Sequence, residues 1–74
     1  MFIRYKNLRG NSNVECYRIR ASAIDVKFYN TNKIYTYSYA GPAGKRNVDN
    51  MKLLAVRGYG LNSYVNRFCR KLYD

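Results

Sequence analysis

A break rich in glycine and proline, residues 41–44, separates two stretches of the chain whose apolar residues follow different periods. Before the break, apolar residues alternate with polar ones, as in Ile24, Val26 and Phe28, and this period of two is typical of a strand with one buried face. After the break, apolar residues recur every three or four positions, which indicates helices. A proline flanked by glycines continues neither a helix nor a central strand. The chain is therefore expected to build a sheet first and helices second.

Turn-forming residues divide the first part of the chain into three expected strands and an N-terminal segment. The strands are residues 14–19, 24–28 and 33–39, and the turns between them fall at Ala21-Ser22 and Asn30-Thr31-Asn32. Residues 1–11 mix apolar and basic side chains and lead into a polar break, so we expect an N-terminal arm or a short strand. We assign residues 12–74 to a single domain, because a chain of 74 residues supports only one modest core.

Two helices are expected after the break. Asn47 suits the N-cap of a helix over residues 48–56, and Gly58 ends that helix. A second helix begins near Asn62, and its apolar stripe consists of Leu61, Val65, Phe68, Cys69 and Leu72. The predicted fold class is therefore α+β, a three-stranded antiparallel β-meander followed by two α-helices packed on one face.

Charge is the property that says most about the partner. Fourteen Lys and Arg residues stand against four Asp and Glu residues, which gives a net charge of +10. Such a field attracts polyanions. Membrane-binding segments concentrate their cations beside an amphipathic helix or a lipid anchor, whereas these are spread along the chain, so we expect no membrane partner. We expect a cytoplasmic domain that binds nucleic acid, RNA rather than DNA. The alternative is a protein-interaction module of a phage accessory type that docks on an acidic protein surface.

A row of tyrosines on the third expected strand is the first candidate binding surface. Its residues are Tyr35, Tyr37 and Tyr39, with Lys27 and Lys33 as neighbouring cations. The rings form either a stacking platform for bases or part of the core. With a three-residue turn, Tyr35 faces Lys27 on the side away from the apolar residues of the preceding strand, and the tyrosines lie beside charge. With a turn of two or four residues, Phe28 lies opposite Tyr35 and both apolar sets join one core.

The outward face of the last helix is the second candidate. It carries Asn66, Arg67, Arg70 and Lys71 at spacings of three and four residues, which place them on one surface. Arginine contacts phosphate through two parallel hydrogen bonds, and lysine acts as a point charge. An ordinary solvated helix face, whose cations suit the C-terminal end of the helix dipole, explains the same pattern.

Catalysis has little support in the sequence, and we expect neither an enzyme nor a cofactor or metal. The chain has no histidine, the commonest general base and metal ligand near neutral pH. Cys16 and Cys69 are far apart in the sequence and lack the short ligand spacing of a zinc site. We interpret both as buried thiols in a reducing cytoplasm.

Four blocks between residues 12 and 73 occur in an order that is informative. They are Ser12-Asn13-Val14, the alternating Ile24, Val26 and Phe28, the motif Tyr35-Thr36-Tyr37, and Gly60-Leu61-Asn62-Ser63-Tyr64-Val65-Asn66 followed by Arg70 and Tyr73. Together they resemble the KTSC family, a short domain found at the C-terminus of some lysyl-tRNA synthetases and as stand-alone proteins of bacteria and phages. This chain departs from the family pattern in a link between Phe28 and Tyr35 that is one residue longer, and in Cys69 at an aliphatic position. The resemblance implies the fold more than a function, because RNA binding is only a proposal for the family.

Overall fold

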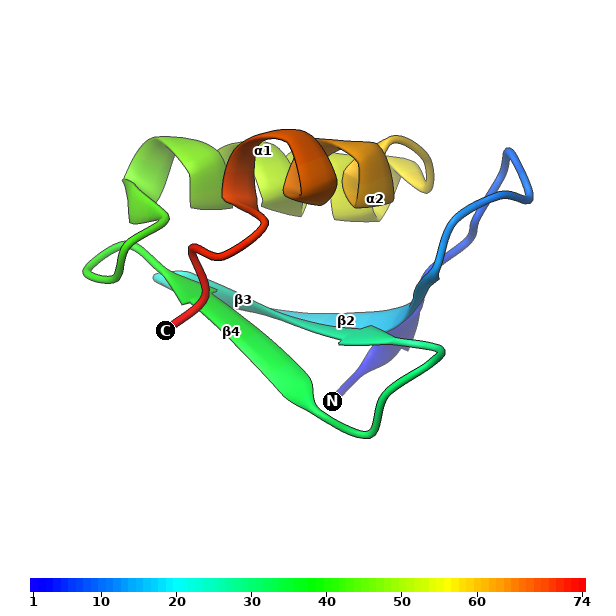
Figure 1. The fold of residues 1–74 in the computed structure, drawn as a ribbon, viewed down its shortest axis with the longest axis horizontal. Helices are drawn as coiled ribbons and strands as arrows, with labels where there is room; N and C mark the ends of the chain where they lie inside the picture. Colours follow the sequence, from blue (N-terminus) through cyan, green and yellow to red (C-terminus); the bar gives the residue numbers. More distant parts are fainter.

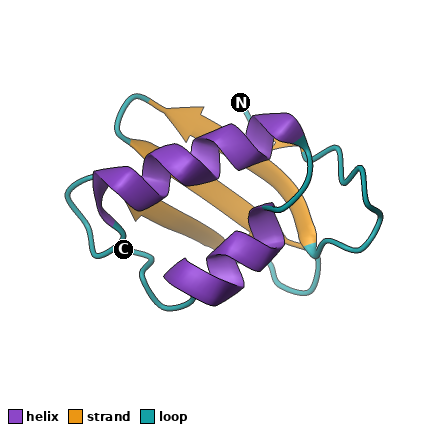
Figure 2. Ribbon diagram, turned by 90° about the horizontal axis from the view of Figure 1, so that it is seen from above, coloured by secondary structure: helices purple, strands orange, loops and turns teal.

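The computed structural model describes residues 1–74 and contains one antiparallel sheet covered on one face by helices (Figures 1 and 2). The strands are β1 (Ile3–Arg4), β2 (Val14–Arg20), β3 (Ala23–Phe28) and β4 (Ile34–Ser38), in the spatial order β1-β2-β3-β4. The helices are α1 (Gly44–Arg57) and α2 (Leu61–Tyr64), and α2 continues into the π-helical turn η1 (Val65–Cys69). The α+β class is confirmed, with four strands instead of the three expected.

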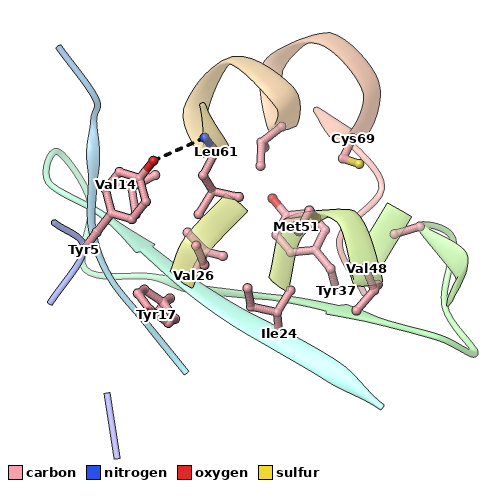
Figure 3. Packing of buried hydrophobic residues seen from close by; sticks show 13 residues of the cluster. Tyr5, Val14, Tyr17, Ile24, Val26, Tyr37, Val48, Met51, Leu61 and Cys69 are labelled. Carbon is pink, nitrogen blue, oxygen red and sulfur yellow. Dashed lines mark hydrogen bonds between the residues drawn. The ribbon is translucent and has the colours of Figure 1, made fainter. Parts of the chain in front are cut away.

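The fourth strand comes from the N-terminal segment, which the sequence left open as an arm or a short strand. β1 pairs with β2, with Ile3 opposite Tyr17. The next residue but one, Tyr5, is buried in the core, and its hydroxyl accepts a hydrogen bond of 3.2 Å from the backbone N–H of Leu61 (Figure 3). Burial raises the pKa of Tyr5 above its ordinary value. The start of the chain is therefore fastened to the sheet and to the first turn of α2.

The register of β3 and β4 decides where the tyrosine row lies. Val26 pairs with Tyr35, and Ile24 pairs with Tyr37. Six residues separate Lys27 and Ile34, the last pair of the two strands. Because this number is even, even-numbered residues of β3 lie opposite odd-numbered residues of β4, and residues that lie opposite each other share a face of the sheet. Tyr35 and Tyr37 therefore face the helices, together with the apolar residues of β3. The tyrosines join the core, as in the second alternative, but the loop is longer than the two or four residues considered and Tyr35 lies opposite Val26 instead of Phe28. The packing of Tyr37 in the buried cluster is visible in Figure 3.

The face of the sheet away from the helices buries one carboxylate. Asp25 is 0% exposed, although alternation along β3 turns it away from the core. Arg18 Nε and Arg20 Nη2 donate to its two oxygens at 2.8 Å each, and Thr36 Oγ1 donates at 2.6 Å. Burial alone would raise the pKa of Asp25, but the hydrogen bonds from Thr36 and from the two guanidinium groups outweigh it, so the pKa is lowered.

The first helix begins earlier than the sequence predicts and lacks the predicted cap. α1 starts at Gly44, and no side chain caps its N-terminus. Asn47 lies inside the first turn, where its Nδ2 donates to the Ala43 carbonyl at 3.0 Å. The predicted end is confirmed: Gly58 has a φ of 89°, a left-handed conformation that glycine adopts without the steric cost of a Cβ atom.

The predicted apolar stripe of the second helical segment is wrong at Phe68, and its last member, Leu72, lies beyond the end of η1, half-buried against the core. Leu61, Val65 and Cys69 are buried, whereas Phe68 is 55% exposed. In a π-helical turn the hydrogen bonds join residues five apart, so the turn is wider than in an α-helix. Residues four apart then stay aligned on the core side, and Phe68, seven positions after Leu61, rotates outward.

Three further features concern the thiols, the C-terminus and membranes. Both cysteines are free; Cys69 is buried as predicted, but Cys16 is only half-buried, since it lies on the sheet face that no helix covers.

The backbone N–H of Asp74 donates to the Thr36 carbonyl at 2.7 Å, and Ser38 Oγ donates to the Asp74 carboxylate at 2.7 Å, so the last residue lies along the outer edge of β4. None of the helices is long and apolar enough to cross a bilayer.

Candidate functional site

A pocket of about 230 Å³ opens between the sheet and the C-terminal helical segment. It is lined by residues from the end of β3, from β4, from α2 and η1, and from the chain on either side of these elements: Asn13, Phe28, Tyr35, Tyr37, Asn62, Val65, Asn66, Arg70 and Tyr73. The pocket exists because the segment after η1 turns back over β4 and brings Tyr73 against the strand. It is smaller than the ~300–1,000 Å³ of most drug-sized sites and suits a single ring or a short side chain.

Aromatic rings form one wall of the pocket. The ring centres of Tyr35 and Tyr73 are 4.9 Å apart, those of Phe28 and Tyr35 are 5.8 Å apart, and those of Tyr37 and Tyr73 are 6.5 Å apart. All three pairs meet edge to face, an arrangement that the quadrupoles of the rings favour. The wall is therefore held by packing before any ligand arrives.

The polar side chains of the pocket are largely without partners in the protein. The side chains of Asn62, Asn66 and Arg70 take part in none of its hydrogen bonds or ion pairs, whereas Asn13 Nδ2 donates to Asn30 Oδ1 at 3.0 Å. The lining contains one guanidinium group and no carboxylate. The pocket therefore offers amide donors and acceptors and a positive charge to a ligand.

The hydroxyl of Tyr37 adds a neutral polar group. Tyr37 is 1% exposed and its hydroxyl makes no hydrogen bond, yet no fully buried side-chain oxygen lacks a partner, so this oxygen must reach the pocket that its ring lines. Burial, and next the nearby Cys69, raise the pKa of Tyr37 to about 12. The hydroxyl thus stays protonated near neutral pH and serves as a donor or an acceptor.

An aromatic and basic surface lies on the same helical segment and the turn after it. Its residues, which we call the helical platform, are the half-buried Tyr64 and the exposed Arg67, Phe68 and Lys71. The rings of Tyr64 and Phe68 are 4.9 Å apart and inclined by 44°, and the Arg67 Cζ atom lies 5.7 Å from the Phe68 ring centre. The Tyr64 hydroxyl donates to Asn47 Oδ1 at 2.7 Å, which fixes the orientation of its ring against α1.

The structure brings some of the predicted site residues together and separates others. Tyr35, Tyr37, Asn66 and Arg70 meet in the pocket, and Arg67 and Lys71 are exposed on the helical platform. Lys27 pairs with Glu15 on the opposite face of the sheet, and Lys33 lies in the exposed β3–β4 loop. Tyr39 donates its hydroxyl to Asp49 and accepts from Lys52 Nζ at 3.1 Å.

The stacking row of three tyrosines that the sequence allowed is therefore not formed. Tyr37 presents no ring face to solvent, and Tyr35 and Tyr39 are half-buried against the core. The physical reason is the even number of residues between the last paired positions of β3 and β4, which turns the tyrosine row toward the helices. Lys27 and Lys33 accordingly do not join the tyrosines in one surface.

Sequence reasoning missed several residues of the site. Asn13, Asn62 and Tyr73 lie within the blocks that resemble the KTSC family, so their co-occurrence was a usable signal. Phe68 had no such signal, because a regular helical period places it in the buried stripe.

The cations that remain unpaired far outnumber the paired ones. Four of the fourteen, Arg18, Arg20, Lys27 and Lys45, form ion pairs, with Asp25, Glu15 and Asp49. The other ten have no carboxylate partner: Arg4, Lys6, Arg9, Lys33, Arg46, Lys52, Arg57, Arg67, Arg70 and Lys71. The positive field of the surface is therefore not neutralised within the protein.

No group of three or more Cys, Asp and Glu side chains is placed to hold a metal ion.

Comparison of the chain with protein-family models, with curated proteins and with solved structures gives no significant match. The resemblance to the KTSC family therefore stays a prediction that rests on the quoted sequence blocks.

Proposed function

We propose that this domain binds single-stranded nucleic acid, RNA in the first place, through the pocket and the helical platform. One observation carries the proposal. The short C-terminal helical segment places an unpartnered arginine, Arg70, beside two unpartnered amides in the pocket, and exposes a phenylalanine, Phe68, on its outer surface. Positive charge, hydrogen-bonding amides and exposed aromatic rings are the three elements that single-strand binding uses.

The phosphate backbone is the part of the ligand that matches the charge. Ten cations without carboxylate partners provide a sequence-independent attraction that salt weakens. Arg67 and Arg70 are the two arginines of the proposed interface, and each can bind a phosphate oxygen pair through its planar fork. The charge supplies affinity and orientation but no base preference.

Unstacked bases are the part of the ligand that matches the rings and amides. Phe68 and Tyr64 offer ring surface on which a base can stack, and the pocket has room for one ring. The amide groups of Asn62 and Asn66 can donate to and accept from a base edge. A duplex conceals its base faces, whereas loops and single strands expose them, and this favours a single strand as the ligand. Two free thiols and the proposed RNA ligand fit a cytoplasmic location.

The first test removes the ring of Phe68. We expect Phe68→Leu to weaken binding of a fluorescently labelled single-stranded RNA by about 5- to 150-fold, since stacking contributes roughly 1–3 kcal/mol per base. Fluorescence anisotropy measures this loss. The matched control is Tyr29→Leu, an aromatic residue of similar exposure, 50%, in the β3–β4 loop, which should bind as the wild type does. Equal affinities of the wild type and Phe68→Leu would remove the stacking role.

The second test removes the two arginines of the interface. For single strands, the log of the affinity falls with the log of the salt concentration, with a slope of about −0.7 for each phosphate contact. Arg67→Gln/Arg70→Gln should therefore reduce the magnitude of this slope by about 1.4. Arg4→Gln/Arg46→Gln removes the same charge from exposed arginines of β1 and α1 that form no ion pair, and should change the slope much less. Single-stranded RNA, duplex RNA and duplex DNA are compared for each protein.

Weak binding that is the same for all three nucleic acids, and that neither set of substitutions changes, would contradict the proposal. It would leave net charge as the only source of affinity. In that case the alternative, docking on an acidic protein surface, becomes the better account of the ten unpaired cations.

A further inference from the structure

A second cluster of cations gathers around one ring where the N-terminal loop meets the end of α1. The Arg9 Cζ atom lies 4.6 Å from the centre of the Tyr59 ring, and the Arg57 Cζ atom lies 4.5 Å from the same centre. Lys6 is close, because a Cβ atom added at Gly58 would come within 2.9 Å of the Lys6 Cβ. None of these three cations has a carboxylate partner.

The fold holds the two sides of this cluster together. The backbone N–H of Leu8 donates to the Gly58 carbonyl at 2.8 Å, which joins the N-terminal loop directly to the residue after α1. On the other side of Tyr59, the Leu61 N–H donates to the buried Tyr5 hydroxyl at 3.2 Å. The two contacts bracket Tyr59, so the approach of the loop to its ring follows from the packing of the core.

The arrangement is not explained by the helix alone. The partial negative charge at the C-terminal end of α1 stabilises a cation in its last turn, which explains Arg57. It does not explain Arg9, which comes from a different part of the chain. Since each Cζ atom lies within 4.6 Å of one ring centre, the two guanidinium groups are at most about 9 Å apart, which is within the Debye length at 0.1 M salt. They therefore repel each other, and negative charge bound at both, as from two linked phosphates, relieves this repulsion.

We propose that Arg9, Arg57 and Tyr59 form a phosphate-binding site for the backbone of the bound strand, separate from the pocket. The Tyr59 ring holds both guanidinium groups by cation–π attraction, so each is positioned to take one of two successive phosphates. None of the three residues lines the pocket. The inference rests on the proposed function for the identity of the strand, and it adds a contact that strengthens binding without reading bases.

Removal of both arginines tests the charge. Arg9→Gln/Arg57→Gln should lower the salt slope for single-stranded RNA by about 1.4, the value for two lost phosphate contacts. Arg4→Gln/Arg46→Gln serves again as the control of equal charge and should change the slope by less than half as much. If the two double variants have the same slope, the cluster acts only through net charge and the site is refuted.

Removal of the ring tests the geometry without a change of charge. Tyr59→Leu keeps both arginines but removes the surface that positions them, so the slope should fall toward that of Arg9→Gln/Arg57→Gln. Circular dichroism checks that the variant is folded. A folded Tyr59→Leu protein with the wild-type slope and affinity would refute the role of the ring.

A titration with inorganic pyrophosphate, followed by NMR, separates this site from the proposed function. The Arg9 and Arg57 side-chain Nε–Hε signals and the Tyr59 ring signals should shift, and those of Arg4 and Arg46 should not. If these shifts occur in a protein that binds no RNA, the phosphate site stands and the proposed function falls. If the RNA binds with the expected dependence on Phe68 but pyrophosphate shifts none of these signals, the proposed function stands and the phosphate site falls.

Discussion

Replacement of Tyr37 by alanine is expected to remove about 3–5 kcal/mol of stability, as for other large aromatic residues deleted from a core. Tyr37 is 1% exposed, packs in the buried cluster, and pairs across the sheet with Ile24. A domain of 74 residues has a total stability of about 4–11 kcal/mol, so this single change consumes much or all of it. Urea unfolding followed by circular dichroism should show a large fall in the transition midpoint, or no folded baseline at all.

Two variants define what the loss at Tyr37 means. Tyr37→Phe keeps the ring and removes only the pocket hydroxyl, so its midpoint should stay close to that of the wild type. Tyr29→Ala removes an aromatic ring that is 50% exposed and should change stability by no more than about 0.5 kcal/mol. If Tyr37→Ala is as stable as Tyr29→Ala, then Tyr37 is not part of the core and the register of β3 and β4 is wrong.

The stability of the domain is expected to fall in acid, because Asp25 binds a proton more readily in the unfolded chain than in the folded protein. The folded-state pKa of Asp25 lies below its ordinary value of 3.8, mainly because hydrogen bonds from Thr36 and two arginines outweigh the effect of burial. A lowered pKa contributes stability that is fully present above the unfolded-state pKa and is lost as the pH falls through the folded-state pKa. Unfolding midpoints should therefore be steady from pH 7 to about 5 and decline below about pH 4.

Asp25→Asn isolates this contribution. It preserves the shape of the side chain but removes the charge that accepts from Arg18 and Arg20, and hydrogen bonds to charged groups contribute about 1.5–3 kcal/mol. We expect a loss of that order at pH 7 and a flatter decline in acid. Asp49 is a more solvated carboxylate whose pKa is also lowered, by hydrogen bonds from Lys45 and Tyr39, so Asp49→Asn should flatten the decline in acid less than Asp25→Asn does. An Asp25→Asn protein whose stability falls as steeply with pH as the wild type would assign the acid sensitivity to other groups.

The fold could be predicted where the pattern is local. The alternation of Ile24, Val26 and Phe28 marks β3 because one face of the strand is buried, and Gly58 ends α1 because its left-handed conformation suits glycine. The register of β4 could not be predicted, since it depends on how many residues the loop leaves between Lys27 and Ile34. Tyr5 was also beyond local reasoning, because its hydrogen-bond partner, Leu61, lies on a distant element.

The candidate site was predictable in part for the same reason. Asn66 and Arg70 could be assigned to one site from their helical spacing, which survives in the structure. Phe68 could not, because a π-helical turn changes the period at that point. The approach of Arg9 and Arg57 to one tyrosine depends on a contact between two loops, and no periodicity in the sequence encodes such a contact.

The position of Asp74 along β4 has a consequence for self-association. An uncovered edge strand offers free N–H and C=O groups to a second molecule and is a common starting point for aggregation and strand exchange. Here the backbone of Asp74 already occupies the Thr36 carbonyl, and the opposite edge strand, β1, is only two residues long. Part of the β4 edge is thus occupied by the chain itself, and the two-residue β1 offers few groups for pairing; together with the like charge of two copies, this should limit edge-to-edge association.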